Sequence, residues 1–212
     1  MAMVPASSYG AAPALPSGDA VAPPRPPGEV PKGTNLMGVM LLLVADFMVL
    51  AAVLTTWFTI KAGSPAWPPG NVHLTTYLPT VVTVTAVMSA FSMQWAVSSI
   101  RRNDQRSAAV AMGLTVFLGI AMVNAQWYSI VRARFSIHSH AYGTLYYLLI
   151  GYHMVHVVLG VGALMLIGAR ALAGHFGRDG YDPVRGAAAL WQYSNFAWFV
   201  IVAAVFLFSH HA

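Results

Sequence analysis

The sequence predicts an all-α, polytopic membrane protein, a bundle of five transmembrane helices. Of its 212 residues 58% are hydrophobic and only 8% are charged, whereas a soluble domain carries about 25% charged residues. Five apolar runs are each long enough to cross a bilayer, which takes about 20 residues of helix. The runs are unbroken rather than alternating, which favours helices over a β-barrel.

The first 34 residues differ in composition from the rest of the chain. They are rich in Pro, Ala and Gly and show no helical period, which is typical of a disordered tail. A cleaved signal peptide needs a basic start and then an apolar core, and neither is present. We therefore expect a disordered tail over 1–34 and a transmembrane domain over 35–212.

The expected spans follow in order, and the basic residues between them indicate the orientation. The spans lie at about 35–60, 78–100, 107–131, 142–169 and 187–209. The tail and the loops near 101–106 and 170–186 then share one side and hold most of the Lys and Arg residues. The other side holds Lys61, Arg132 and Arg134. Because cytoplasmic loops are enriched in Lys and Arg, the N-terminus is expected in the cytoplasm and the C-terminus outside.

Aromatic residues and arginines near the span ends suggest contacts with the membrane interface. Aromatic residues fall near the expected outer ends, where an aromatic belt is expected: Trp57, Trp67, Tyr77, Tyr128 and Tyr142. Arg101, Arg102 and Arg106 lie at the inner edge and are candidate contacts for anionic lipid headgroups. A role in topology alone is the simpler interpretation of these arginines. The basic residues lie in loops, so the net charge of +5 does not indicate a nucleic-acid partner.

Asp46 is the only acidic residue inside the expected spans. It lies about 15 Å from the inner end of its helix at 1.5 Å per residue, close to the bilayer centre. A charge there costs about 2.5–3.5 kcal/mol on insertion scales, so an intramembrane acid is a functional-site candidate by default. A protonated Asp46 bonded to a neighbouring helix, with a purely structural role, is an equally good interpretation.

Two histidines stand in the apolar stretch GYHMVHVVLG, residues 151–160. His153 and His156 are three residues apart and share a helix face with Tyr146 and Gly160. Such a polar, small-residue stripe indicates a face that packs against other helices. Because Asp46 is expected at a similar depth, we hypothesise that it bonds to His153 or His156.

The residue inventory argues against a metal or haem centre in this chain. There is no cysteine, which excludes thiolate ligands, and a metal site needs three or four convergent ligands. A bis-His haem needs a histidine at mid-depth on a facing helix, and no other span has one. We therefore expect no cofactor-binding, metal-binding or catalytic residue here. The amides Asn124, Gln192 and Asn195 are more typical of interhelical hydrogen bonding than of catalysis.

These stretches together resemble the cytochrome c oxidase subunit III family in its five-helix bacterial form. GYHMVHVVLG is similar to the family's Gly-x-His-x-x-His-Val-x-x-Gly signature. LLLVADFMVLAAVLTTWF, with Asp46, resembles the first helix of this form, and LWQYSNFAWFVIVAAVFLF resembles the closing helix. The closing helix usually reads Trp-His-x-x-Asp, where this chain has Gln192 and Asn195, and Trp127 replaces a third-helix glutamate. These departures put in doubt any role tied to the replaced ionisable groups.

The resemblance implies a non-catalytic subunit of a respiratory haem–copper oxidase in the inner membrane of a bacterium. Such a subunit packs on subunit I, whose haem and copper carry the chemistry, and binds phospholipid in a cleft between helices. It supports proton uptake and stability during turnover. Two alternatives remain open: a related accessory protein of a nitric oxide reductase system, and a small proton-linked transporter that uses Asp46. A lack of internal repeats argues against the transporter.

Overall fold

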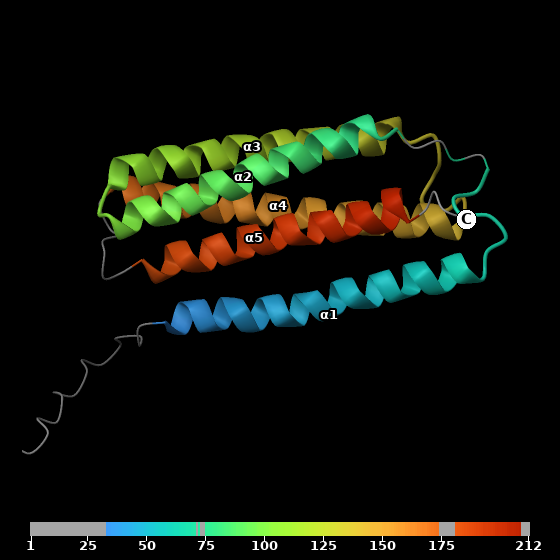
Figure 1. The fold of residues 1–212 in the computed structure, drawn as a ribbon, viewed down its shortest axis with the longest axis horizontal. Helices are drawn as coiled ribbons and strands as arrows, with labels where there is room; N and C mark the ends of the chain where they lie inside the picture. The colour runs from blue at the N-terminus through green and yellow to red at the C-terminus, as the bar shows by residue number, and fades with distance from the viewer. Residues whose placement is uncertain (1–32, 71, 73–74, 174–180, 209–212) are drawn as a thin grey trace, which may run out of the picture. The chain divides into compact units, whose positions relative to one another are not determined.

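Five long helices make up the part of the chain that the computed structural model describes, residues 33–70, 72, 75–173 and 181–208. They are α1 (Thr34–Ala62), α2 (Tyr77–Arg101), α3 (Gln105–Arg132), α4 (Ala141–Leu172) and α5 (Asp182–Val202), and α5 continues as a π-helix, η1 (Ala203–Leu207) (Figure 1). Each is long and apolar enough to cross a membrane, and the described residues contain no strand. The predicted all-α, five-span architecture is confirmed. The predicted tail lies outside the described residues, except for Gly33 and Thr34.

The fifth helix begins earlier than the sequence suggested. It starts at Asp182, five residues before the predicted 187, and Pro183 occupies its first turn. Proline is favoured at this position because its missing N–H has no helical partner there. The following Gly186, Ala187 and Ala188 are buried, so a stretch that looks like a loop of small residues is a close-packed helix start.

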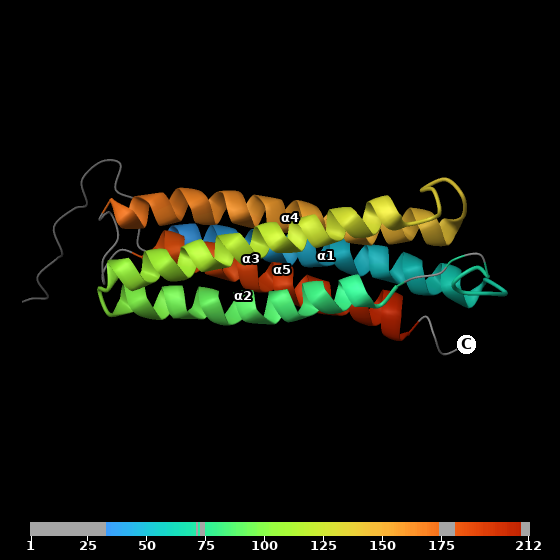
Figure 2. The same cartoon turned by 90° about the horizontal axis from the view of Figure 1, so that it is seen from above.

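Helices α2, α3, α4 and α5 form an antiparallel four-helix bundle, and α1 lies outside it. Neighbours in the bundle pack in the order α2–α3–α4–α5, and α5 also packs on α2. α1 packs mainly on α5 and, to a smaller extent, on α4 (Figures 1 and 2). One face of α1 therefore meets the protein, and its other faces are open.

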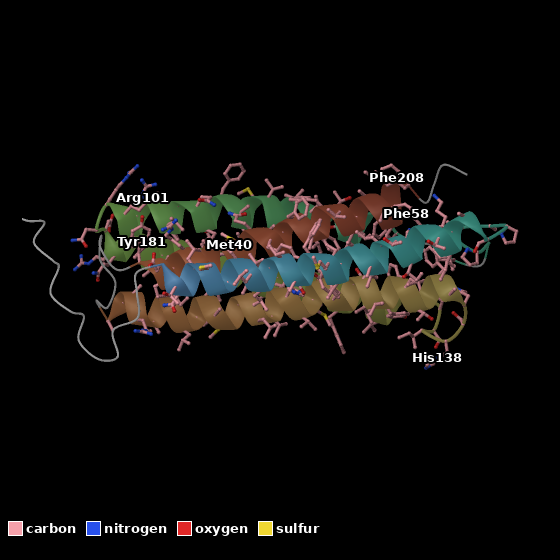
Figure 3. All side chains as sticks on the ribbon, turned by 90° about the horizontal axis from the view of Figure 1, so that it is seen from below. Met40, Phe58, Arg101, His138, Tyr181 and Phe208 are labelled. Atoms are coloured by element: carbon pink, nitrogen blue, oxygen red, sulfur yellow. The ribbon has the colours of Figure 1, made fainter. Side chains whose placement is uncertain are left out.

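The two ends of the bundle differ in charge. We call the end where α2 and α4 finish, and where α3 and α5 begin, the arginine end; it carries Arg101, Arg102, Arg106, Arg170 and Arg185. Figure 3 shows Arg101 and Tyr181 at this end, with His138, Phe58 and Phe208 at the opposite one. The grouping of basic residues predicted from the loops is thus present in the fold.

A tight turn joins α2 to α3 at the arginine end. Asn103 adopts a left-handed conformation, with φ of 61°. Asp104 then caps α3 by accepting a hydrogen bond from the Ser107 backbone N–H at 3.1 Å. Hydrogen bonds from Ser107 hold the pKa of Asp104 below its ordinary value. The turn is therefore fixed by local bonds.

The side chain of Trp191 is the point at which the four bundle helices meet. A Cβ atom added at Gly119 of α3 would lie 2.6 Å from its ring, and one added at Gly160 of α4 would lie 2.8 Å from it. Its indole Nε1 donates a hydrogen bond to Ser89 Oγ of α2 at 3.2 Å. The two glycines thus form a slot for the indole, which explains why Gly160 lies on the inward stripe of α4.

Polar contacts fasten both ends of α1. At the arginine end the Gly33 backbone N–H donates to Asp182 Oδ2 at 2.6 Å. At the opposite end the Lys61 ammonium group donates to the carbonyl of Phe208, just beyond the π-helix. The Phe58 and Phe208 rings also pack there, with centroids 6.4 Å apart (Figure 3). A cation is favourable at this position because the last carbonyls of a helix lack partners.

The predicted aromatic belt is wrong for three of its five members. Trp57, Trp67 and Tyr142 are buried and pack on one another, with ring centroids 4.9–5.1 Å apart. Only Tyr77 and Tyr128 are exposed as a belt requires. The buried three instead join the end of α1, the following loop and the start of α4, because large rings in edge-to-face contact fill a helix junction well.

Gly160→Ala is expected to destabilise the fold, because the new methyl group would overlap the Trp191 ring. Overpacking of this kind costs about 1–3 kcal/mol. Gly162→Ala, two residues away, is the matched control, because nothing lies within 4 Å of its added Cβ. Thermal unfolding in detergent, followed by tryptophan fluorescence, measures both. Equal unfolding temperatures for the two variants would contradict the role given to the slot.

Candidate functional site

Three polar side chains from α4 and α5 meet around Asp46 of α1. His156 Nε2 of α4 lies 3.0 Å from Asp46 Oδ2, and the Tyr152 hydroxyl donates to the same oxygen at 2.5 Å. The Tyr193 hydroxyl of α5 lies 2.9 Å from that of Tyr152. We call these four residues the Asp46 cluster. The hypothesis that Asp46 bonds to one of the two histidines is confirmed, and the partner is His156.

The Asp46 cluster lies near the middle of its helices and is largely shielded. Asp46 is about 18 Å along the axis from Thr34 at 1.5 Å per residue, and His156 stands near the centre of α4. The side chains of His156 and Asp46 keep 14% and 20% of their accessible surface. An acid and a base thus meet where water is scarce, so their contact and the Tyr152 bond to Asp46 take the place of bonds to water.

His153 belongs to a different contact, which α4 makes with α3 and α5. Its Nδ1 lies 2.5 Å from Gln126 Nε2 of α3, and its ring packs against that of Trp198 of α5 at 4.8 Å. The imidazole is fully buried. The prediction left two candidate partners for Asp46. Their spacing of three residues turns the two imidazoles in different directions, so His153 contacts α3 and His156 contacts α1.

Two of the predicted amides join helices α2 and α5. The Asn195 side chain is buried and donates weakly to Ser89 Oγ at 3.4 Å. Gln192 Nε2 donates to the Ala90 carbonyl at 3.1 Å. These two positions, which carry ionisable groups in the family pattern, thus act here as neutral interhelical hydrogen-bond donors.

Asn124 does not join this or any other described interhelical contact. It is exposed, and its amide donates to the Ile120 carbonyl of its own helix at 2.9 Å. Trp127, at the position of the family's third-helix glutamate, is also exposed. The buried polar side chains of α3 that face the bundle are Thr115 and Gln126.

Tyr152, Tyr193 and Gln126 take part in these contacts but are not among the predicted site residues. Tyr152 is four residues before His156 and so lies on its face, which is a signal that could have found it. Tyr193 and Gln126 carry no such local signal, because their partners are on other helices. Among the described residues no group of three or more His, Cys, Asp or Glu side chains is close enough to hold a metal ion.

Gln126→Leu is expected to lower the free energy of unfolding by about 1–2 kcal/mol, because it leaves the buried Nδ1 of His153 without a partner. Asn124→Leu is the matched control on the same helix, since its exposed amide contacts no other helix; it should unfold at or above the wild-type temperature. Thermal unfolding in detergent reports both. An unfolding temperature of Gln126→Leu equal to that of wild type would show that the contact contributes nothing.

Comparison with known proteins finds one family model and several named relatives that match this chain. A family model described as cytochrome c oxidase subunit III matches residues 27–210. The chain is 28% identical over 175 residues to cytochrome c oxidase subunit 3 of Synechocystis sp., covering 82% of this chain and 75% of that protein. It is 18% identical over 176 residues to the Thermostichus vulcanus protein of the same name, covering 82% and 87%. A probable cytochrome c oxidase subunit 3 of Rickettsia bellii is 25% identical over 190 residues, covering 81% and 68%. Because the family model spans nearly the whole chain, the protein belongs to the cytochrome c oxidase subunit III family.

Proposed function

We propose that this chain, as subunit III of a haem–copper oxidase, holds no redox centre of its own and packs in the membrane against subunit I, which carries the haem and copper. The observation that carries this proposal is the set of contacts made by polar side chains inside the spans. His153, His156 and Asn195 each contact another transmembrane helix. Their chemistry suits a bundle held together by polar bonds between helices.

The difference in charge between the two ends of the bundle supports an orientation of the chain in the membrane. The arginine end faces the cytoplasm, following the excess of Lys and Arg in cytoplasmic loops, so the C-terminus lies outside. The membrane is the inner membrane of a bacterium. Similarity to proteins of Synechocystis and Rickettsia supports the bacterial setting.

Bound phospholipid is part of the proposal. A hollow of about 380 Å³ lies at the arginine end, lined by Asn103, Asp104, Gln105, Arg106 and Leu172. Arg101 and Arg102 are exposed beside it in the sequence. Guanidinium groups at this level attract the anionic phosphates of the inner leaflet. Arg101, Arg102 and Arg106 are therefore the headgroup contacts we propose.

The Asp46 cluster supports proton uptake and stability during turnover. An acid and an imidazole meet there within the described spans, and such a pair can bind a proton. It also ties α1 to α4 and α5 through side chains. A substitution in this cluster therefore weakens the attachment of α1 as a whole.

Purification of the tagged chain under gentle detergent conditions tests the assignment. We expect a haem absorbance spectrum, a co-purifying subunit I identified by mass spectrometry, and oxygen consumption by the complex. Nitric oxide reduction in place of oxygen consumption would identify the alternative accessory role. A chain that elutes alone from respiring membranes, or that binds haem when expressed by itself, would contradict the proposal.

Asp46→Ala is expected to leave assembly intact and to shorten the active lifetime of the complex during turnover. The substitution removes the acceptor of the Tyr152 hydroxyl and the partner of His156, so α1 is held less firmly. Thr55→Ala on the same helix is the control, because that hydroxyl is exposed and bonds only to the Ala51 carbonyl. Oxygen consumption followed until activity decays measures both, and equal lifetimes would rule out this role for Asp46.

A further inference from the structure

The direction of each hydrogen bond in the Asp46 cluster follows from one group that can only accept. His156 Nδ1 lies 2.8 Å from the backbone carbonyl oxygen of Tyr152. A carbonyl has no proton to give, so Nδ1 carries the proton and donates. A neutral imidazole has a single N–H. In the neutral ring, Nε2 therefore presents a lone pair to Asp46 Oδ2 at 3.0 Å.

A bond between these two atoms requires a proton between them. An ionised Asp46 and a neutral His156 would place two lone pairs opposite each other. If Asp46 is protonated, its O–H donates to Nε2; if His156 is protonated, its Nε2–H donates to the carboxylate. Either way the pair holds one proton and has no net charge, which suits a site where an uncompensated charge is costly.

The two tyrosines extend the same chain of bonds. The Tyr152 hydroxyl donates to Asp46 Oδ2, so its oxygen is left to accept from the Tyr193 hydroxyl at 2.9 Å. The bonds then run from Tyr193 to Tyr152, to Asp46, to His156 and back to the Tyr152 carbonyl. A relay passes a proton onward only if its last acceptor can release one to a further group. A backbone carbonyl cannot, so the path is closed beyond His156.

We propose that Asp46 and His156 form a one-proton binding site that stores a proton in the membrane and does not conduct it across this chain. The groups that face the pair are Tyr152 from α4 and Tyr193 from α5. His153, about 60° around α4 from His156, points toward α3 and is bonded to Gln126. The inference deepens the proposed role in proton uptake, and it concerns this chain alone, so it can fail while the subunit assignment stands.

Infrared spectroscopy of the purified full-length chain tests the stored proton near neutral pH. The difference between wild type and Asp46→Asn should show either the C=O stretch of a protonated Asp46 or the imidazolium bands of His156, with labelled histidine identifying the second. The difference between wild type and Asp104→Asn, a substitution in the exposed turn, is the control and should lack these bands. An ionised Asp46 together with a neutral His156 would overturn the proposal.

The thermal stability of two Asp46 variants is an independent test of the proton between Asp46 and His156. An Asn side chain can donate its N–H to His156 Nε2 as the acid O–H does, whereas Leu cannot. Asp46→Asn should therefore unfold close to the wild-type temperature, and Asp46→Leu should unfold at a lower one. Equal losses in the two variants would contradict a proton lying between Oδ2 and Nε2.

Proton flux through the chain in liposomes tests the closed path. Vesicles that contain the protein and a pH-sensitive dye should take up protons no faster than empty vesicles when a potential is applied. The Asp46→Asn protein should behave in the same way. A flux through the wild-type chain that Asp46→Asn abolishes would show a conducting path and would overturn the storage role.

Discussion

The insertion of Trp191 between Gly119 and Gly160 is the contact on which the rest of the bundle depends. Association of helices in a membrane gains little from hydrophobic burial, because lipid is as apolar as the helix surface, so close packing and polar bonds must hold the helices together. The indole reaches α3 and α4 through the two glycines and α2 through Ser89. It fixes the rotation of α4 about its axis, and this rotation sends His153 toward α3 and leaves His156 for α1.

The rotation of α4 divides one sequence motif between two structural roles. His153 is fully buried against Gln126 and Trp198 and is part of the packing of the bundle. His156 is partly exposed and joins the Asp46 cluster on the α1 side. Three residues correspond to roughly 300° around a helix of 3.6 residues per turn, so the side chains diverge by about 60°. This is close enough to suggest a shared face in the sequence and far enough to reach different helices.

Composition and periodicity were sufficient to predict the five spans, because each apolar run must cover the hydrocarbon thickness. They also predicted the Asp46–histidine contact, since an acid and an imidazole at equal depth have few other polar groups to choose from. Partners that come from distant helices, such as Tyr193 and Gln126, depend on helix rotation, which apolar runs do not specify. The same limit explains the error over Trp57, Trp67 and Tyr142. Position along a span indicates depth, and it does not separate a ring that faces lipid from one that faces a helix junction.

The packing of α1 connects the proton site to the subunit as a whole. Leu50 and Trp57 are the buried residues of this helix in the described chain, so its attachment relies on polar contacts at three levels. Asp182 holds one end, Lys61 holds the other, and the Asp46 cluster holds the middle. The first two do not need the Asp46 proton, whereas the Asp46–His156 bond exists only while these two residues share one. The Tyr152 hydroxyl donates to Asp46 in either state. Loss of that proton would set two lone pairs against each other and weaken the central attachment of α1. Whether the Asp46–His156 site holds its proton therefore affects how firmly α1 is attached to the bundle.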